Sequence, residues 1–442
     1  MSFDLPTLPD GWKFEALDSC CQKGSITYGI VQPGSPVSSG VPIIRVNNFR
    51  DYRLDLTEVM TVASDVAAKY ERTRLFGGEV LLTVVGTVGQ VAVVSKNLAG
   101  YNVARAVAVI HPLPHVSADW IALCLRSPLA QHLLGSRANT TVQTTINLKD
   151  LRALPIPLPP VHEREAITAM VGALDDRITL LRETNATLEA IAQALFKSWF
   201  VDFDPVRAKM EGRAPDGMDE ATAALFPDSF EETELGAVPR GWSMGGLSAL
   251  LRLHKGSVNP GGQPDTEFQH FSLPAFDAGQ IPVAEFGSEI KSNKTSVPAD
   301  GVLLSKLNPH IPRIWLPSAV GSQAVCSTEF LPFVPNGPST TAFVYCLLSD
   351  PDFSKQLCQL VTGTSNSHQR IKPDGVLSLQ AVVPHAGVIA AFDGVVSSLL
   401  ERLKANRLEA QTLGTLRDTL LPRLISGQLR LPEAQTLLEA TA

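Results

Sequence analysis

The sequence predicts an α+β protein built as a tandem duplication, in which two similar domains are joined by two long antiparallel coiled-coil helices. Three observations support this fold class. Short strings recur at a nearly constant offset, β-rich runs precede a helical stretch inside each repeat, and a heptad pattern follows each repeat. The chain has 442 residues, which exceeds the usual size of a single hydrophobic core.

Four pairs of strings carry the internal repeat. They are LPDGW from Leu8 with VPRGW from Val238, QKGS from Gln22 with HKGS from His254, EVLLT from Glu79 with GVLLS from Gly301, and TTINLKDLRALPIPLPP from Thr144 with HQRIKPDGVLSLQAVVP from His368. The offset stays between about 222 and 232 residues throughout. A constant offset over four matches indicates duplication of one globular unit followed by a helix.

Each repeat is predicted to mix strands and helices. In the first repeat, runs rich in β-branched residues lie at Val80–Val85, Val91–Val94 and Ala106–Ile110, and Gly and Pro separate them. A helical stretch follows at Trp120–Leu134, and its equivalent is Thr341–Val361. These patterns predict two α+β domains of about 150 residues each.

A seam of apolar residues, with spacings that alternate between three and four, follows each repeat. The first seam is Ile167, Val171, Leu174, Ile178, Leu181, Asn185, Leu188, Ala192, Leu195 and Trp199, and the second is Ile389, Phe392, Val396, Leu399, Leu403, Asn406, Ala410, Leu413, Arg417, Leu420 and Leu424. This spacing is typical of a coiled coil. Pro160 and Pro384 precede the two helices, where a proline interrupts no interior turn.

One asparagine lies near the middle of each seam. If the helices are antiparallel, Asn185 and Asn406 meet and can form a hydrogen bond that fixes the register of the helix pair. The alternative is that either amide faces water. An antiparallel pair also suits the chain path, because the first helix leads to the second repeat and the second helix returns.

The formal net charge of −7 resides in one stretch. Between Asp202 and Gly236 there are ten acidic residues and three basic ones, so the rest of the chain is formally neutral. This distribution allows a basic face on each domain without demonstrating one. The six cysteines form no CxxC pair and have no histidines at zinc-finger spacing, so we expect free, mostly buried thiols.

Several classes of protein are disfavoured by the sequence. No run of eighteen uncharged apolar residues predicts a membrane span, and the N-terminus has no secretory pattern, so we expect a cytoplasmic protein. We find no phosphate loop, HExxH, GxSxG or full GxGxxG motif. An amino-methyltransferase motif is also missing, since Asn308-Pro309-His310 lacks its second proline and aromatic residue. We therefore expect no catalytic centre and no metal site.

These features together resemble the specificity subunits of type I restriction–modification systems. The resemblance rests on the LPxGW opening, on EVLLTVVGTVGQVAVV from Glu79, on PIPLPPVHEREAI from Pro155, and above all on ALFKSWFVDFDPV from Ala194 and LLPRLISGQL from Leu420. It implies two target-recognition domains and two long helices. The expected segments are target-recognition domain 1 at 1–158, a first helix at 159–201, an acidic linker at 202–236, target-recognition domain 2 at 237–384, a second helix at 385–427 and a C-terminal tail at 428–442.

The resemblance also implies partners. We expect double-stranded DNA, two methyltransferase subunits and, in the full complex, restriction subunits, with no membrane. S-adenosylmethionine and ATP are expected on those partner subunits, and no cofactor is expected in this chain. Phe196, Trp199 and Phe200 correspond to scaffold and subunit-contact positions in the family, and local packing is the alternative for these rings.

Base recognition requires side chains such as Arg, Lys, Asn, Gln, Ser and Thr on loops. The first domain offers two such segments and the second domain two more. The candidate DNA-binding residues are Arg45, Asn47, Asn48 and Arg50; Arg137, Asn139, Thr140 and Gln143; Lys306, Asn308, His310 and Arg313; and Ser365, Asn366, His368, Gln369, Arg370 and Lys372. The alternatives are turn chemistry or solvated loops, and phosphate contacts for the cations.

A duplicated domain on a helix pair suits a target in two parts. Roughly 33 residues of helix at about 1.5 Å each give a spacer near 50 Å, or at most about 15 base pairs. Because the two domains share a framework but differ in their polar loops, we expect two unrelated half-sequences and hence an asymmetric target. The rival hypothesis is a coiled-coil interaction scaffold that does not bind DNA.

Overall fold

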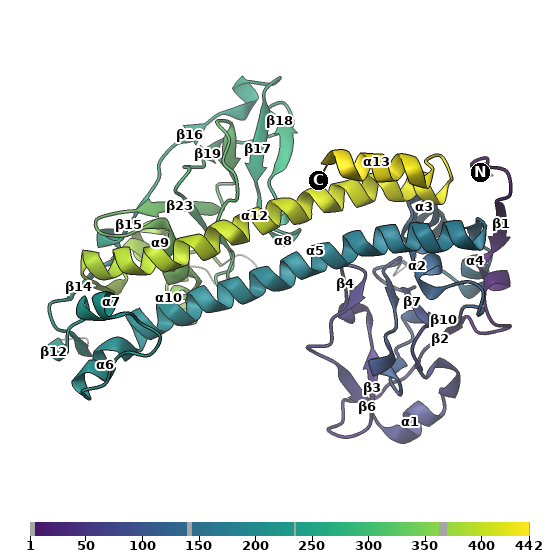
Figure 1. Ribbon diagram of the computed structural model, residues 1–442, viewed down its shortest axis with the longest axis horizontal. Coiled ribbons are helices and arrows are strands. Elements are labelled where there is room, and N and C mark those ends of the chain that lie inside the picture. The colour runs from purple at the N-terminus through teal and green to yellow at the C-terminus, as the bar shows by residue number, and fades with distance from the viewer. Residues whose placement is uncertain (1–4, 139–143, 234–235, 362–368, 442) are drawn as a thin grey trace. The chain divides into compact units, whose positions relative to one another are not determined.

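The computed structural model describes residues 5–138, 144–233, 236–361 and 369–441 (Figure 1). The chain forms two compact units. Unit 1 consists of Met1–Arg177 and Leu413–Ala442, and unit 2 of Ile178–Thr412. The two long helices both continue from one unit into the other, so each unit contains one end of each helix.

Unit 1 is built on small sheets. Its four-stranded sheet has the order β2-β10-β7-β8, its three-stranded sheet has the order β6-β3-β9 with β3 and β9 parallel, and β1 pairs with β11. The strands are β1 (Lys13–Ala16), β2 (Thr27–Tyr28), β3 (Val41–Ile44), β4 (Phe49–Arg50), β5 (Arg53–Leu54), β6 (Met60–Val62), β7 (Val80–Thr83), β8 (Val91–Val93), β9 (Asn102–Val103), β10 (Val107–Ile110) and β11 (Pro155–Leu158). The three predicted strand runs are therefore confirmed as β7, β8 and β10.

Unit 2 repeats this topology with additions. Its sheet β15-β23-β20-β21 matches β2-β10-β7-β8, and β24 pairs with β14 as β11 pairs with β1. A parallel β17–β22 pair matches β3–β9 inside a five-stranded sheet. The strands are β12 (Phe230–Thr233), β13 (Gly236–Pro239), β14 (Ser243–Gly246), β15 (Leu251–Leu253), β16 (Ser257–Val258), β17 (Glu267–Phe271), β18 (Val283–Phe286), β19 (Lys294–Ser296), β20 (Val302–Ser305), β21 (Ile314–Trp315), β22 (Ala324–Cys326), β23 (Phe330–Pro335) and β24 (Gln380–Val383).

The helical stretch of each unit is interrupted by proline at the same place. Ser127 caps the second helix of unit 1, with Pro128 in its first turn, and Asp350 with Pro351 does the same in unit 2. A proline at this position fits a helix start but not a helix interior. Each predicted stretch is thus two helices, namely α2 (Ala118–Arg126) and α3 (Pro128–Arg137), and α9 (Thr341–Ser349) and α10 (Pro351–Gln359).

Short helices complete the two units. They are α1 (Ser64–Ala68), α4 (Leu148–Arg152), α6 (Asp204–Met210), α7 (Glu220–Ala224), α8 (Leu273–Asp277), α11 (Pro373–Ser378) and α13 (Leu431–Thr441). The predicted acidic linker and the predicted C-terminal tail are both folded. The acidic stretch contributes Val206 and Phe226 to the core of unit 2, and the C-terminal stretch contributes Leu429 and Ala434 to the core of unit 1. Apolar residues between the acidic ones explain why the first stretch packs rather than extends.

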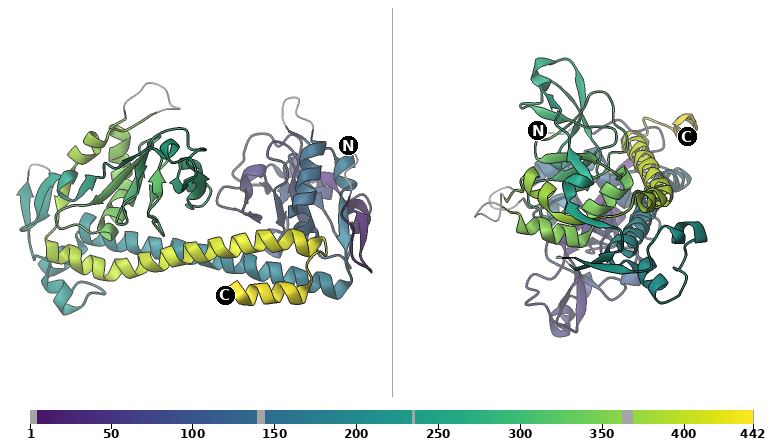
Figure 2. Two further views of the ribbon diagram at one scale, coloured as in Figure 1. Left: turned by 90° about the horizontal axis from the view of Figure 1, so that it is seen from above. Right: turned by 90° about the vertical axis from the view of Figure 1, so that its left-hand side faces the viewer.

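The two long helices are α5 (Val161–Phe196), which ends in a π-helical turn at Lys197–Val201, and α12 (Ala386–Ile425). They run alongside each other in Figure 1 and in the left view of Figure 2. Their side-chain contacts are antiparallel within each unit. In unit 1, Asp175 of α5 contacts Arg417 of α12, and Glu163 near the start of α5 contacts Arg430, which lies just after the end of α12; in unit 2, Asn185 contacts Asn406. The predicted antiparallel pair is therefore confirmed.

Both ends of the helix pair belong to a domain core. Ile167, Val171 and Leu424 are buried in the core of unit 1, and Phe196 and Phe392 in the core of unit 2. Full burial of each such side chain contributes about 1.5–3 kcal/mol.

At one turn the predicted seam differs from the structure. Leu400 is buried there rather than Leu399, because a straight helix has 3.6 residues per turn and drifts from a strict 3.5-residue repeat.

The two asparagines meet in unit 2. The Asn406 side chain is 1% exposed, and its Nδ2 donates to Asn185 Oδ1 at 2.9 Å, while Asn185 Nδ2 donates to the Leu403 carbonyl at 3.2 Å. The hydrogen bond that the sequence predicts is thus present. Sliding of one helix would leave a buried amide against leucine, so register specificity remains the prediction for this pair.

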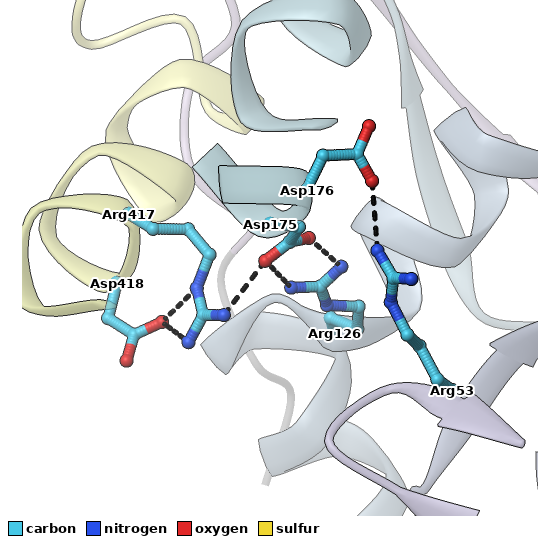
Figure 3. A network of polar contacts seen from close by, with 6 residues as sticks. All are labelled: Arg53, Arg126, Asp175, Asp176, Arg417 and Asp418. Atoms are coloured by element: carbon cyan, nitrogen blue, oxygen red, sulfur yellow. Dashed lines mark hydrogen bonds and ion pairs between the residues drawn. The ribbon is translucent and has the colours of Figure 1, made fainter. Parts of the chain in front are cut away.

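A second polar contact crosses the helix pair in unit 1 (Figure 3). Asp175 on α5 accepts hydrogen bonds from Arg126 Nη1 on α2 and from Arg417 Nη1 on α12, both at 2.8 Å. Burial disfavours the ionised form of Asp175, but hydrogen bonds and charge from both arginines outweigh it and hold its pKa below the ordinary value. Arg417 therefore occupies a predicted seam position as one member of an ion network.

The ion network around Asp175 also contacts the β4–β5 hairpin. The β4–β5 hairpin turns through Asp51 and Tyr52, both with positive φ. The Arg126 guanidinium lies over the Tyr52 ring at 3.9 Å, and the neighbouring Arg53 donates to Asp176 Oδ1 at 2.8 Å. Cation–π stacking and the ion pair thus offset a turn that bulky residues rarely adopt.

The cysteines are free thiols, as the sequence predicts. Cys20, Cys21, Cys124, Cys326 and Cys346 are buried, and Cys358 is exposed. Burial raises the pKa of Cys20 to about 11 and that of Cys21 to about 12, so these thiols stay protonated and unreactive near neutral pH.

The ion network gives a stability prediction. Asp175→Ala is expected to lower the free energy of unfolding by about 3 kcal/mol, because two mostly buried guanidinium groups lose their carboxylate. Asp418→Ala removes an exposed partner of Arg417 and should cost less than about 1 kcal/mol. Urea unfolding at neutral pH measures both, and equal losses would contradict the assignment.

The same variant has a defined pH dependence. Because the folded-state pKa of Asp175 is lowered, its stabilisation is complete above the ordinary value of 3.8 and is lost as the pH falls through the lower folded-state value. The difference in free energy of unfolding between wild type and Asp175→Ala, measured by urea unfolding, should therefore narrow only in acid.

Candidate nucleic-acid interface

In unit 2 the fold brings the two polar segments nominated from the sequence together. Leu307 forms an antiparallel bridge with Arg370. Asn308 N donates to the Gln369 carbonyl at 2.8 Å, and Ile371 N donates to the Lys306 carbonyl at 3.0 Å. Segments more than fifty residues apart in sequence thus lie side by side next to the β20–β21 hairpin.

Asn308 has the backbone of a turn residue. Its φ of 52° lies in the left-handed region, which asparagine adopts more readily than other non-glycine residues. Its carbonyl accepts from Ile311 N at 2.8 Å and closes a turn that exposes His310 and Ile311. Asn308 Oδ1 is buried without a hydrogen-bond partner among the described residues. The loop is therefore well defined, with His310 at its exposed tip.

The cations of these two segments differ in availability. The Arg313 side chain is 15% exposed and forms two hydrogen bonds with Asp277, at 2.7 and 2.9 Å. The Arg370 side chain is 44% exposed and pairs with Glu329 at 3.0 and 3.2 Å, which raises its pKa. An exposed ion pair contributes little and exchanges readily, whereas a partly buried bidentate pair does not. Arg370 and the exposed Lys372 therefore suit a ligand better than Arg313.

In unit 1 the nominated residues have mixed roles. Asn48 is 2% exposed, and its amide accepts from Arg45 N and donates to the carbonyls of Asp55 and Glu58. These bonds are turn chemistry, the alternative considered for this segment, and they leave Asn48 no free group for a base. Asn47 and Arg50 are exposed, with Arg50 3.4 Å from Asp55, and Arg45 Nε is buried without a hydrogen-bond partner in the described part of the chain.

The second segment of unit 1 begins at the end of α3. Arg137 Nη1 donates to the Asp150 carbonyl at 3.3 Å and is partly buried. Six nominated residues lie outside the described residues, namely Asn139, Thr140, Gln143, Ser365, Asn366 and His368.

The β7–β8 loop of unit 1 was not among the segments predicted from the sequence. Thr144 and Ile146, which follow the nominated segment, form hydrogen bonds with Gly86 and Val84 in the β7–β8 loop. The signal for this loop was present in the repeat. Aligning EVLLT with GVLLS places Gly86 opposite Asn308, but Gly86–Gln90 carries no charge and was not selected as a polar segment.

Comparison with known proteins gives the family. Residues 14–190 match the family described as type I restriction modification DNA specificity domain. The chain is 27% identical over 394 residues to the HindI specificity subunit of Haemophilus influenzae, a type I restriction enzyme subunit, and the match covers 77% of this chain and 84% of that protein. Residues 14–190 thus match the type I DNA specificity domain, and most of the chain is similar to type I specificity subunits.

Two further relatives agree with this assignment. The MjaIX specificity subunit of Methanocaldococcus jannaschii is 23% identical over 387 residues, with 84% of this chain and 82% of that protein covered. The solved S subunit of the type I system of M. genitalium superposes with a TM-score of 0.51 at 15% identity, over 96% of this chain and 97% of that one. The latter supports the fold of the specificity subunit alone.

Three aromatic residues were predicted to lie at subunit contacts. Phe196, Trp199 and Phe200 are 2%, 7% and 7% exposed and pack on one another and on Phe392. Phe200 also contacts Phe343 and Trp242. The geometry favours the alternative, local packing, since rings in a core offer a partner little surface. Partner contact by these residues gains no support from the structure and stays a prediction.

Among the described ranges, no group of three or more His, Cys, Asp or Glu residues is placed to hold a metal ion. The helices within the described residues include none with the length and apolar character of a membrane span.

Proposed function

We propose that this specificity subunit recognises an asymmetric DNA target in two parts, one part for each unit. The observation that carries the proposal is the duplicated topology, in which equivalent sheets present different loops. Unit 2 presents Asn308 and His310 where unit 1 presents Gly86 and Val88 in the aligned repeat. Domains that share a framework but differ in their contact residues suit two unrelated half-sequences.

The charge distribution of unit 2 favours some of its elements over others for DNA contact. The acidic stretch 202–236, which carries the formal charge of −7, forms α6, α7 and β12. Phosphates are repelled by such a surface and attracted by Lys306, Arg370 and Lys372. We therefore assign DNA contact to the loops that carry Lys306, Arg370 and Lys372, and not to α6 and α7.

The chemistry is assigned to partner subunits. In this proposal two methyltransferase subunits bind S-adenosylmethionine and modify the target, and restriction subunits use ATP in the full complex. The chain itself contributes recognition and positioning, binds no cofactor and performs no catalysis. Such a complex acts where the DNA of the cell lies, so the cytoplasmic location expected from the sequence is part of the proposal.

One experiment distinguishes the proposed function from the rival hypothesis, a scaffold that never binds DNA. The chain assembled with its methyltransferase partner is expected to retain a subset of genomic fragments in the presence of random-sequence competitor, with affinity that falls as salt rises. Methylation mapping of the host genome should then give a two-part motif. Absence of retention at every salt concentration would support the scaffold instead.

The two arginines of unit 2 give a matched pair of variants. Arg370→Ala should weaken binding of the cognate DNA roughly tenfold, because an exposed guanidinium is lost from the proposed interface. Arg313→Ala should change affinity less than Arg370→Ala at equal stability, since Asp277 already holds its guanidinium. Titrating both variants on the same DNA fragment compares their affinities. A larger loss for Arg313→Ala than for Arg370→Ala would refute the assignment.

The long helices are proposed to set the gap between the two half-sequences. Deleting residues 178–184 from α5 and 408–414 from α12 removes one heptad from each helix between the pairs Asp175–Arg417 and Asn185–Asn406. The deletion shortens each helix by about 10 Å, so the methylated motif should lose about three base pairs of its gap. A motif with an unchanged gap in an active complex would exclude this role.

A further inference from the structure

The β7–β8 loop of unit 1, Val84–Gln90, is the structural counterpart of the β20–β21 loop of unit 2, Lys306–Arg313. Both loops follow the strand that pairs with β10 in unit 1 and with β23 in unit 2. Both return to the edge strand of the same four-stranded sheet. The loops therefore project from the same end of equivalent sheets.

Their hydrogen bonds coincide as well. In unit 1, Ile146 N donates to the Val84 carbonyl at 3.0 Å and Gly86 N donates to the Thr144 carbonyl at 2.9 Å. In unit 2, the corresponding bonds join Ile371 N to Lys306 O at 3.0 Å and Asn308 N to Gln369 O at 2.8 Å. Each loop is thus held by the chain segment that enters α4 or α11.

The backbone at the start of each tip is also the same. Gly86 has a φ of 78° and Asn308 one of 52°, the left-handed conformation in both cases. In unit 1, Gln131 of α3 fixes the far side of the tip, because its Nε2 donates to the Gly89 carbonyl at 2.9 Å. Between these anchors Gly86 and Thr87 are exposed.

We propose that the tip Gly86–Gly89 contacts the phosphate backbone of DNA through the exposed Thr87 hydroxyl. This inference rests on the proposed function of the chain. The tip has no charged side chain and no side-chain amide, so it lacks the bidentate groups that read guanine and adenine. The N–H groups of Gly86 and Gly89 already donate to the Thr144 and Thr83 carbonyls, so we assign the contact to the exposed Thr87 hydroxyl, since hydroxyls are common phosphate ligands. Bidentate base contacts of unit 1 are therefore assigned to other segments of the unit.

Charge substitutions at the tip test this inference. With the full chain in complex with its methyltransferase partner, Thr87→Glu should lower affinity at least tenfold for the cognate fragment and for random DNA alike, because a carboxylate faces a phosphate. Thr87→Lys should raise affinity for both. The matched control is Thr436→Glu, at another exposed threonine, on α13, which should bind as wild type does.

The outcomes separate this inference from the function on which it rests. If wild type retains its target and both Thr87 variants bind like wild type, the tip assignment is wrong. A loss confined to fragments with one half-sequence would also overturn it, since that result indicates base recognition. If wild type shows no DNA retention at all, the proposed function fails. Thr87→Lys guards against a folding artefact, because a misfolded variant does not gain affinity.

Discussion

The antiparallel register of α5 and α12 is the constraint on which each unit depends. Both helices supply core residues to both units, so the sheets of a unit pack on a surface made by two chain segments that are distant in sequence. A shift of one helix along the other would misplace these residues. We predict that Asn185–Asn406 and Asp175–Arg417 oppose such a shift, because it would leave a buried amide or guanidinium against apolar side chains. An apolar seam alone would tolerate several registers.

The ion network connects this register with the loops of unit 1. Asp175 and Asp176 follow each other on α5 and bind Arg126, Arg417 and Arg53, which come from three other elements. Tyr52, in the turn of the β4–β5 hairpin, stacks under Arg126. The hairpin that continues from the Arg45–Arg50 segment is thereby fixed to the helix pair. In unit 2 the hydrogen bond between Tyr345 of α9 and Glu189 of α5 joins domain and helix in a comparable way.

The candidate interface shows that residue type alone is a poor guide to contact. Arg313 and Arg370 are both arginines on polar loops of one unit, yet the first is held by Asp277 in a partly buried pair and the second pairs with Glu329 near solvent. Asn48 has the chemistry for adenine recognition, but its amide is used by the backbone of its own loop. What a side chain can offer a ligand depends on the hydrogen bonds that it already makes.

The sequence by itself determined the duplication, the strands β7, β8 and β10, the two long helices and the meeting of Asn185 with Asn406. These features depend on local periodicity and on repeated strings, which are visible in one dimension. The tertiary structure decided which polar residues are available. It showed that the acidic stretch is folded, that Phe196, Trp199 and Phe200 are core residues, and that Arg417 pairs with Asp175. Such facts depend on contacts between distant segments, and no local pattern encodes them.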